Sequence, residues 1–467
     1  MPPGIAMVLA NPAFPALKAL VIETTGMAFY RDKDSDLARI LQERMDEIGI
    51  GDCATYLGLL QSPGEGTVEM EAFIAELTIG ETYFFRHKEQ FDALRDLILP
   101  DVIKRNQTVR RLRIWSAGCA TGPEPYSIAI MLEREFGRQI AGWHVSILGT
   151  DINQKFLARA REGRFDEWAF RVMPDSLRAA CFDKVGRQWL IRPEYKRHVT
   201  FQYHNLIKSS FPSIADNIAG LDIIICRNVI IYFSQETVEK LVPCFRDSLS
   251  EGGWLIMGHA EPNQQLFRRF KTVNTPGAVL YQRAEPQSAP APAIVVPPLP
   301  SPPPRMPASP LLKPVLPPRP IPPPALPTAP VAVPPVEDLA RARNLADAGQ
   351  WEEAAAACDA LIAKTPLVAW AHFYRAMIHE QVGETEACEK ALRRAIYLDR
   401  RLVLPHYHLG LFLSRQDDVK GAVRSFRNAQ ALVDGLPDDR PVAEGDKITV
   451  GQMREALAMH LNLLGDP

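Results

Sequence analysis

The chain has 467 residues, of which 46% are hydrophobic, and this length predicts two or three domains with real cores. Its 53 basic and 55 acidic residues give a formal net charge of −2, so neither nucleic acid nor an acidic membrane is favoured as a partner. Seven scattered cysteines without a CxxC pair favour reduced thiols in the cytoplasm over a disulfide framework. Residues 4–22 are apolar but contain Pro12 and Pro15 and follow no basic segment, so we expect neither a signal peptide nor membrane insertion.

The first part of the chain predicts a small helical domain at residues 15–90. Apolar residues recur at helical spacing between Asp36 and Ile48, and again between Met70 and Leu77. After Arg110 the pattern changes to apolar runs of strand length, each followed by a helix. These runs are Leu112–Trp115, Val145–Gly149, Leu221–Cys226 and Trp254–Met257. The alternation predicts a mostly parallel sheet with helices on both faces at residues 91–284, with ligands beyond the carboxyl ends of the strands.

The loop after the first of these strands, within Arg113–Ser127, consists of small residues that include Gly118 and Gly122. Small residues let a ligand touch the backbone, and the helix that follows offers free N–H donors at its start. The spacing matches neither the dinucleotide fingerprint GxGxxG nor a P-loop. Two interpretations remain at this point: the loop binds a nucleotide-like cofactor, or it packs a helix tightly against the sheet.

Polar residues stand at the ends of two further strands. Asp151 ends the second strand, where its carboxylate can accept two hydrogen bonds from a ribose diol. The alternative is an N-cap for the helix that starts near Asn153, and the neighbouring glycine loop favours the ribose role. Asn228 follows the strand Leu221–Cys226 and can donate and accept a hydrogen bond there, or form a structural turn.

A proline-rich segment divides the chain. Of its 41 prolines, 22 lie between Pro286 and Pro335, where no glycine occurs. Prolines remove hydrogen-bond donors and favour extended dihedral angles, so residues 285–336 are predicted to be a disordered, semi-rigid linker.

The part after the linker repeats with a period of 34 residues. Small and apolar residues recur in register at Ala342, Ala376 and Gly410; Ala354, Cys388 and Ala422; Cys358, Leu392 and Phe426; and Leu361, Ala395 and Ala429. This period resembles tetratricopeptide repeats, in which helix pairs stack into an all-α solenoid. We expect about three repeats at 337–436 and a helical cap or tail at 437–467, with an unrelated helical bundle as the alternative. Such solenoids bind a peptide or protein on their concave face, and the sequence does not identify the partner.

Three motifs in order carry a resemblance to a known family: Glu81–Arg86, Ser116–Ser127 and Cys226–Phe233. Together they resemble the CheR-type chemoreceptor methyltransferases, and the resemblance covers roughly residues 37–283. The added repeats resemble the WspC-type variant of alternative chemosensory systems. The resemblance implies a Rossmann-like domain that uses S-adenosylmethionine to methylate glutamates on the cytoplasmic domain of a chemoreceptor. The products would be glutamate 5-O-methyl esters and S-adenosylhomocysteine.

The resemblance implies cofactor-binding roles at Gly80, Thr82, Arg86, Gly118, Glu124, Asp151, Asn205, Leu206, Asn228 and Val229. Thr82 and Arg86 would line the methionine end of the cofactor and the approach of the acceptor. Glu124 would meet the cofactor amino group, and Asp151 would accept the ribose hydroxyls.

The other implied contacts lie further along the chain. Asn205-Leu206 would flank the adenine, and Asn228-Val229 would close the pocket. Gly80 stands where many members of the family have asparagine, which leaves its role in doubt. The insertion at 163–197 corresponds to the small β-subdomain of the family, which in some members grips a receptor C-terminal peptide.

Arg86 and Tyr232 are the candidates for orienting the acceptor carboxylate, Arg86 by bidentate pairing, and a simple core position is the alternative for Tyr232. A glutamate with a pKa of about 4.3 is already ionised at neutral pH, so no general base is required. The sequence contains no HExxH motif and no metal-spaced histidines, and we expect no metal. Two other functions stay open: an S-adenosylmethionine-binding sensing adaptor that acts through the repeats, or a methyltransferase for another substrate.

Overall fold

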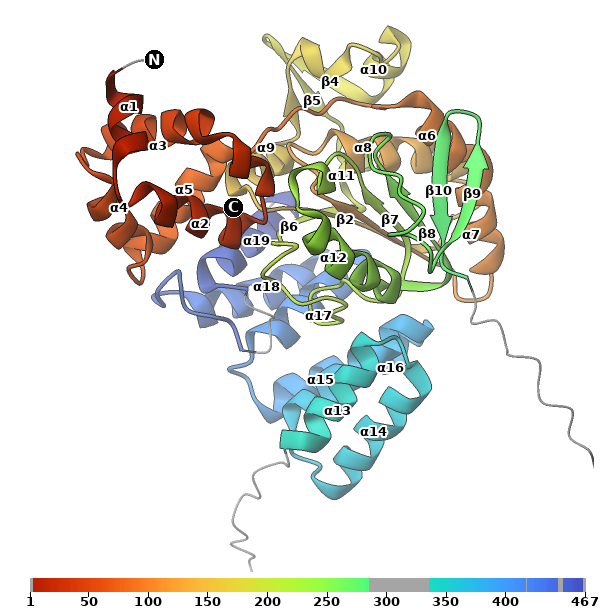
Figure 1. Ribbon diagram of the computed structural model, residues 1–467. Helices are drawn as coiled ribbons and strands as arrows, with labels where there is room; N and C mark the ends of the chain where they lie inside the picture. The colour runs from red at the N-terminus through yellow and green to blue at the C-terminus, as the bar shows by residue number, and fades with distance from the viewer. Residues whose placement is uncertain (1–2, 285–335, 417, 444–447, 465–467) are drawn as a thin grey trace, which may run out of the picture.

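The computed structural model describes residues 3–284, 336–416, 418–443 and 448–464 (Figure 1). The predicted proline-rich linker therefore lies outside the described residues, apart from residue 336, where a helix begins. In the described ranges no single helix is long and apolar enough to cross a membrane. One pair, Gly4–Ala10 with Phe14–Thr25, has the required length and composition only when joined, and it is bent by 86° at the break.

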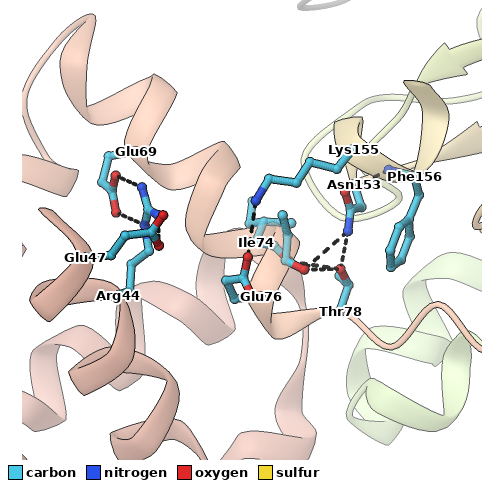
Figure 2. Close-up of polar contacts among 10 residues, drawn as sticks. Arg44, Glu47, Glu69, Ile74, Glu76, Thr78, Asn153, Lys155 and Phe156 are labelled. Atoms are coloured by element: carbon cyan, nitrogen blue, oxygen red, sulfur yellow. Dashed lines mark hydrogen bonds and ion pairs between the residues drawn. The ribbon is translucent and has the colours of Figure 1, made fainter. Parts of the chain in front are cut away.

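The N-terminal part is helical. Its helices are α1 (Pro3–Ala10), α2 (Phe14–Thr25), α3 (Asp34–Ile48), α4 (Cys53–Leu60) and α5 (Glu65–Leu77). They surround an apolar cluster that includes Leu17, Leu41 and Phe73. Figure 2 shows Arg44 of α3 facing Glu69 of α5, and its Nε and Nη2 donate to the two carboxylate oxygens at 2.7 and 2.6 Å. This largely buried bidentate ion pair fixes α3 against α5.

A seven-stranded sheet forms the centre of the described residues, in the order β6-β2-β1-β7-β8-β10-β9. Its strands are β1 (Arg111–Ala117), β2 (His144–Asp151), β6 (Val199–Tyr203), β7 (Leu221–Cys226), β8 (Leu249–Met257), β9 (Lys271–Thr275) and β10 (Ala278–Gln282). The first five strands are parallel to their neighbours, and β10 pairs antiparallel with both β8 and β9. The predicted Rossmann-like α/β fold is confirmed.

Helices cover both faces of this sheet (Figure 1). They are α6 (Lys88–Ala93), α7 (Leu99–Arg105), α8 (Pro123–Met131), α9 (Gln154–Glu162) and α12 (Gln235–Ser248). Strand β1 shows how the sequence divides the faces, since alternate side chains of a strand point to opposite sides. Leu112 and Ile114 lie in the cluster with α6 to α9, whereas Trp115 and Ala117 lie in the cluster with α12.

A small subdomain is inserted between α9 and β6. It contains β3 (Arg164–Phe165), α10 (Asp175–Cys181), β4 (Phe182–Val185), β5 (Gln188–Ile191) and α11 (Pro193–Lys196). Its strands pair antiparallel in the order β3-β5-β4. Phe84, from the Glu81–Arg86 motif, stacks on Phe170 at 5.1 Å and meets Phe165 and Phe182 edge-on, so this motif is packed against the insertion.

The C-terminal part is the expected all-α solenoid. Its helices are α13 (Val336–Asp347), α14 (Trp351–Lys364), α15 (Ala369–Val382), α16 (Thr385–Leu398), α17 (Val403–Arg415), α18 (Val419–Val433) and α19 (Val450–Leu463). The positions that recur every 34 residues are all buried, and they belong to one apolar cluster apart from Leu361 and Gly410. A Cβ at Gly410 would lie 2.5 Å from the Phe426 ring, so a small residue is required where α17 crosses α18.

Candidate active site

A cavity of 330 Å³ lies between the N-terminal helices and the carboxyl ends of the central strands. The strand order reverses between β1 and β7, because β1 leads to β2 on one side and β7 leads to β8 on the other. Ligands of open α/β sheets bind at such a switch point. The loops after β1, β2 and β7 line one wall, and side chains from parts of the segments 25–30 and 77–82 line the other.

The glycine loop after β1 forms the floor of the cavity. Gly118 has a positive φ of 76°, its N–H donates to the Thr150 carbonyl at 2.8 Å, and a Cβ there would collide with Val229. Gly122, with φ 95°, stands at the start of α8. Only glycine adopts these conformations without strain, so the loop both packs α8 on the sheet and exposes its backbone to the cavity.

Asp151 ends β2 and lies on the cavity wall. Its Oδ2 accepts a hydrogen bond from Ala120 N and its Oδ1 accepts one from Asn153 N, both at 2.9 Å. Burial raises the pKa of this carboxyl to about 6. The N-cap of α9 is Asn153, whose side chain accepts from Phe156 N, so Asp151 does not cap that helix.

Glu124, in the first turn of α8, is part of a buried polar network. Its Oε1 accepts from Ser116 Oγ at 2.7 Å, and its Oε2 accepts from Arg227 Nε at 2.6 Å. Arg227 Nη1 also donates to the Arg86 carbonyl at 2.6 Å and to Gln90 Oε1 at 2.9 Å. Arg227 thereby joins the turn after β7 to α8 and to residues 86–90.

The turn after β7 places Asn228 and Val229 on the cavity wall. Asn228 has a φ of 59°, a conformation that few residues other than glycine adopt. The buried carboxylate of Glu261 holds this turn by accepting from Asn228 N at 3.2 Å and from Val229 N at 2.9 Å. The Asn228 side-chain Oδ1 is buried and has no hydrogen-bond partner among the described residues, so it is available to a ligand donor.

Thr82, Arg86 and Tyr232 lie on the cavity wall next to the N-terminal helices. Arg86 Nη1 donates to the Glu81 carbonyl at 2.5 Å, whereas its Nε is buried without a partner in the described part of the chain. Burial raises the pKa of the Tyr232 phenol, so its hydroxyl remains a donor at neutral pH. Tyr232 is half-buried and contacts Phe29 edge-on at 6.0 Å, so it lines the cavity and is not a core residue.

Asn205 and Leu206 also line the cavity, at the end of β6. The Asn205 side chain is already engaged: Nδ2 donates to the Thr24 carbonyl at 2.8 Å, and Oδ1 accepts from Ile207 N at 2.9 Å. Asn205 therefore joins α2 to the sheet, and contact with a ligand is left to its backbone and to Leu206.

Gly80 is not among the residues that line the cavity. A Cβ at this position would lie 2.5 Å from Cζ of Phe156, whose ring is itself part of the wall. The glycine thus makes room for a phenylalanine, which gives the departure from the family's asparagine a steric reason.

The N-terminal wall is held to the sheet by α9. Asn153 Nδ2 donates to Thr78 Oγ1 at 2.6 Å, and Lys155 Nζ lies 3.2 Å from Glu76 Oε1 (Figure 2). Thr78 follows α5 directly and lines the cavity. These contacts fix the distance between the two walls.

Sequence reasoning missed Arg227 and Glu261, which support the site. Arg227 follows β7 directly, and Glu261 follows the end of β8 by four residues. A charged residue just after an apolar strand is the sequence signal that could have identified both. Among the described residues, no group of three or more histidine, cysteine, aspartate or glutamate side chains is placed to hold a metal ion.

The cavity presents both backbone and side-chain hydrogen-bonding groups to a ligand. It offers exposed backbone at Gly118, a carboxylate at Asp151 for hydroxyl groups, and the unpaired acceptor of Asn228. The strand order and the place of the cavity define a Rossmann-like α/β domain with a ligand-sized cavity at the carboxyl ends of its strands.

Comparisons with known proteins agree with this class. Residues 80–279 match the model of the CheR methyltransferase, S-adenosylmethionine-binding domain. A probable chemotaxis protein methyltransferase of Rhizobium etli is 33% identical over 246 residues, which are 52% of this chain and 89% of that protein. A probable biofilm formation methyltransferase WspC of Pseudomonas aeruginosa is 28% identical over 408 residues, which are 83% of this chain and 91% of that protein.

The chain belongs to the CheR methyltransferase family, and its architecture is like that of WspC. It is an S-adenosylmethionine-dependent protein methyltransferase with a C-terminal tetratricopeptide-like solenoid.

Proposed function

We propose that the chain methylates glutamate side chains on the cytoplasmic domain of a methyl-accepting chemoreceptor. The products are glutamate 5-O-methyl esters and S-adenosylhomocysteine, and the reaction takes place in the cytoplasm for adaptation of a chemosensory pathway. The names of the relatives support a chemotaxis or biofilm-signalling role.

The observation that carries the proposal is the pair of donors at Arg86 and Tyr232. Arg86 Nε is buried without a partner in the described part of the chain, and Tyr232 keeps its phenolic proton, so both can donate to an acceptor carboxylate. A glutamate carboxylate is ionised at neutral pH and accepts such bonds without giving up a proton.

S-adenosylmethionine supplies an electrophilic methyl group on a positively charged sulfur. One carboxylate oxygen forms the new C–O bond as the S–C bond breaks, and the electron pair of that bond returns to sulfur. The protein's contribution is to hold the acceptor in line and to exclude water, since opposite charges are neutralised in the transition state.

The test is a comparison of Arg86→Ala and Arg86→Lys with the wild type, using a receptor cytoplasmic domain as acceptor. Loss of an orienting cation should lower kcat by about 100-fold or more in Arg86→Ala, with less loss in Arg86→Lys. Affinity for S-adenosylmethionine, measured by calorimetry, should change little because Asp151, Asn228 and Gly118 remain. Unchanged kcat in Arg86→Ala would remove this residue from the acceptor site.

A further inference from the structure

The first helix of each solenoid pair, together with α19, faces the methyltransferase domain. In tetratricopeptide solenoids this row of helices lines the concave, ligand-binding face. Residues from this row that bond or pair with the methyltransferase domain are Asp347 of α13, Glu380 and Gln381 of α15, His408 of α17 and Glu455 of α19. The concave face is therefore in contact with the chain's own catalytic domain.

Residues 211–219, between β6 and β7, lie against this face; we call them the docking segment. Ile214, Ala215 and Ala219 are buried in the same apolar cluster as the core of the solenoid. Ile214 N donates to Asp347 Oδ1 at 2.8 Å, so a side chain of α13 binds the backbone of the docking segment.

His408 of α17 contacts the backbone of the next residue of the docking segment, Ala215. Burial lowers the pKa of His408 to about 4, so the ring is neutral at pH 7. Its Nε2 lies 3.0 Å from the Ala215 carbonyl, which can only accept, so Nε2 carries the ring proton and donates it.

Two buried arginines at the start of β1 take partners from the solenoid. Arg113 Nη1 donates to Gln381 Oε1 at 2.6 Å, and Arg111 donates to the Gln381 carbonyl near the C-terminus of α15. A buried guanidinium without acceptors is costly, and a helix C-terminus favours cations. Arg113 also donates to the carbonyls of Asn217 and Ala219, so it joins the docking segment to α15.

The docking segment is continuous with the cofactor site. The Phe211 ring meets His204 at 5.4 Å and Trp115 at 5.3 Å. His204 and Asn205 line the cavity, and Ser209 N donates to the Asn205 carbonyl at 2.9 Å. Only a short, hydrogen-bonded turn separates the wall of the cavity from the solenoid.

We propose that the ligand of the concave face is the docking segment of the same chain, and that this intramolecular binding supports the nucleoside end of the cofactor site. An external peptide reaches the concave face only by displacing the docking segment. The proposal concerns the cofactor site and does not depend on the identity of the methyl acceptor.

The test uses the full-length chain. Hydrogen exchange at 213–219 in the wild type should be as slow as in β7, whereas displacement would make it as fast as in exposed loops. The double variant Asp347→Ala/His408→Ala should exchange at least tenfold faster there. Its affinity for S-adenosylmethionine should fall by about fivefold or more, as expected for coupled sites.

Two controls separate coupling from misfolding. Asp347→Asn keeps an acceptor for Ile214 N and should retain slow exchange at 213–219. Tyr397→Ala removes an exposed side chain of α16, which belongs to the opposite row of helices, and should change neither the exchange nor the cofactor affinity. Fast exchange at 213–219 in the wild type would overturn the proposal directly. Fast exchange in the double variant with unchanged cofactor affinity would overturn the link to the cofactor site.

Discussion

Asp151 has two tasks, because its carboxylate holds Ala120 and Asn153 and also faces the cavity. Its folded pKa of about 6 lies above the usual value of 3.8. Between these values the folded state binds the proton more strongly than the unfolded chain does. The contribution of Asp151 to the free energy of unfolding therefore falls as the pH rises through this window.

Cofactor binding should show the opposite trend. Only the ionised Asp151 carboxylate accepts two hydroxyl donors, so affinity for S-adenosylmethionine should rise by up to about tenfold per pH unit below pH 6 and level off above it. Calorimetry across this range measures the trend. Asp151→Asn should bind more weakly with no such rise, and an equal rise in that variant would assign the trend to another group.

Gly80 and Phe156 form a steric pair. In Gly80→Asn the new Cβ meets the Phe156 ring at 2.5 Å, and overpacking of this kind costs about 1–3 kcal/mol of unfolding free energy. Urea unfolding measures this loss. Adding Phe156→Ala should remove part of the loss because the clash is gone, whereas simple additivity of the two losses would show that the residues do not conflict.

At the residue scale, the sequence predicted which side chains after strands line the cavity, but it did not predict the hydrogen bonds and ion pairs that hold them. Of the ten predicted cofactor residues, Gly80 lies off the cavity wall and the rest line it. Arg227 and Glu261 were missed because their partners, Glu124 and the turn at Asn228, are distant along the chain. Local pattern does not encode such contacts.

Helix α9 shows how one element fixes the width of the cavity. Asn153 caps α9 through its Oδ1 and bonds Thr78 through its Nδ2, so one side chain joins both walls (Figure 2). Asn153→Ala should lower the unfolding free energy by about 1–2 kcal/mol and weaken cofactor binding.

The matched variant is Asn153→Asp. It keeps the cap but cannot donate to Thr78, so its unfolding free energy should lie between those of the wild type and Asn153→Ala in urea titrations. Equal losses in both variants would mean that the cap contributes nothing.

At the element scale, periodicity predicted more than any single residue did. The predicted strand Leu221–Cys226 coincides with β7, and Leu112–Trp115 lies inside β1. The start of β8 was missed because Leu249–Gly253 contains the exposed Glu251 and two glycines, lies at a register shift in the pairing with β7, and has no apolar run.

At the scale of the whole molecule, the solenoid's place against the sheet was not predicted. The repeat register indicated a solenoid. It did not indicate that α15 would lie beside β1 and supply hydrogen-bond acceptors to the buried Arg111 and Arg113. Charged residues in a strand gave no hint of which surface would supply their acceptors.

This arrangement predicts the behaviour of a chain that ends at Ala284. It loses the Glu380 and Gln381 carbonyls that accept from Arg111, loses the Gln381 side chain that accepts from Arg113, and exposes the docking segment. Its Tm should therefore fall by more than about 4 °C relative to the full chain. Calorimetry measures the shift. Methyl transfer should survive in reduced form because no described solenoid residue lines the cavity, and an unchanged Tm would contradict the docking contacts.

The most direct measurement of the central claim is methyl transfer from radiolabelled S-adenosylmethionine to a chemoreceptor cytoplasmic domain, scored as methanol released by base. Only a carboxyl methyl ester releases methanol in this way. We predict base-labile label with the wild type and little with Arg86→Ala or Asp151→Ala. Label that resists base, or equal label with these variants, would contradict glutamate methylation at this site.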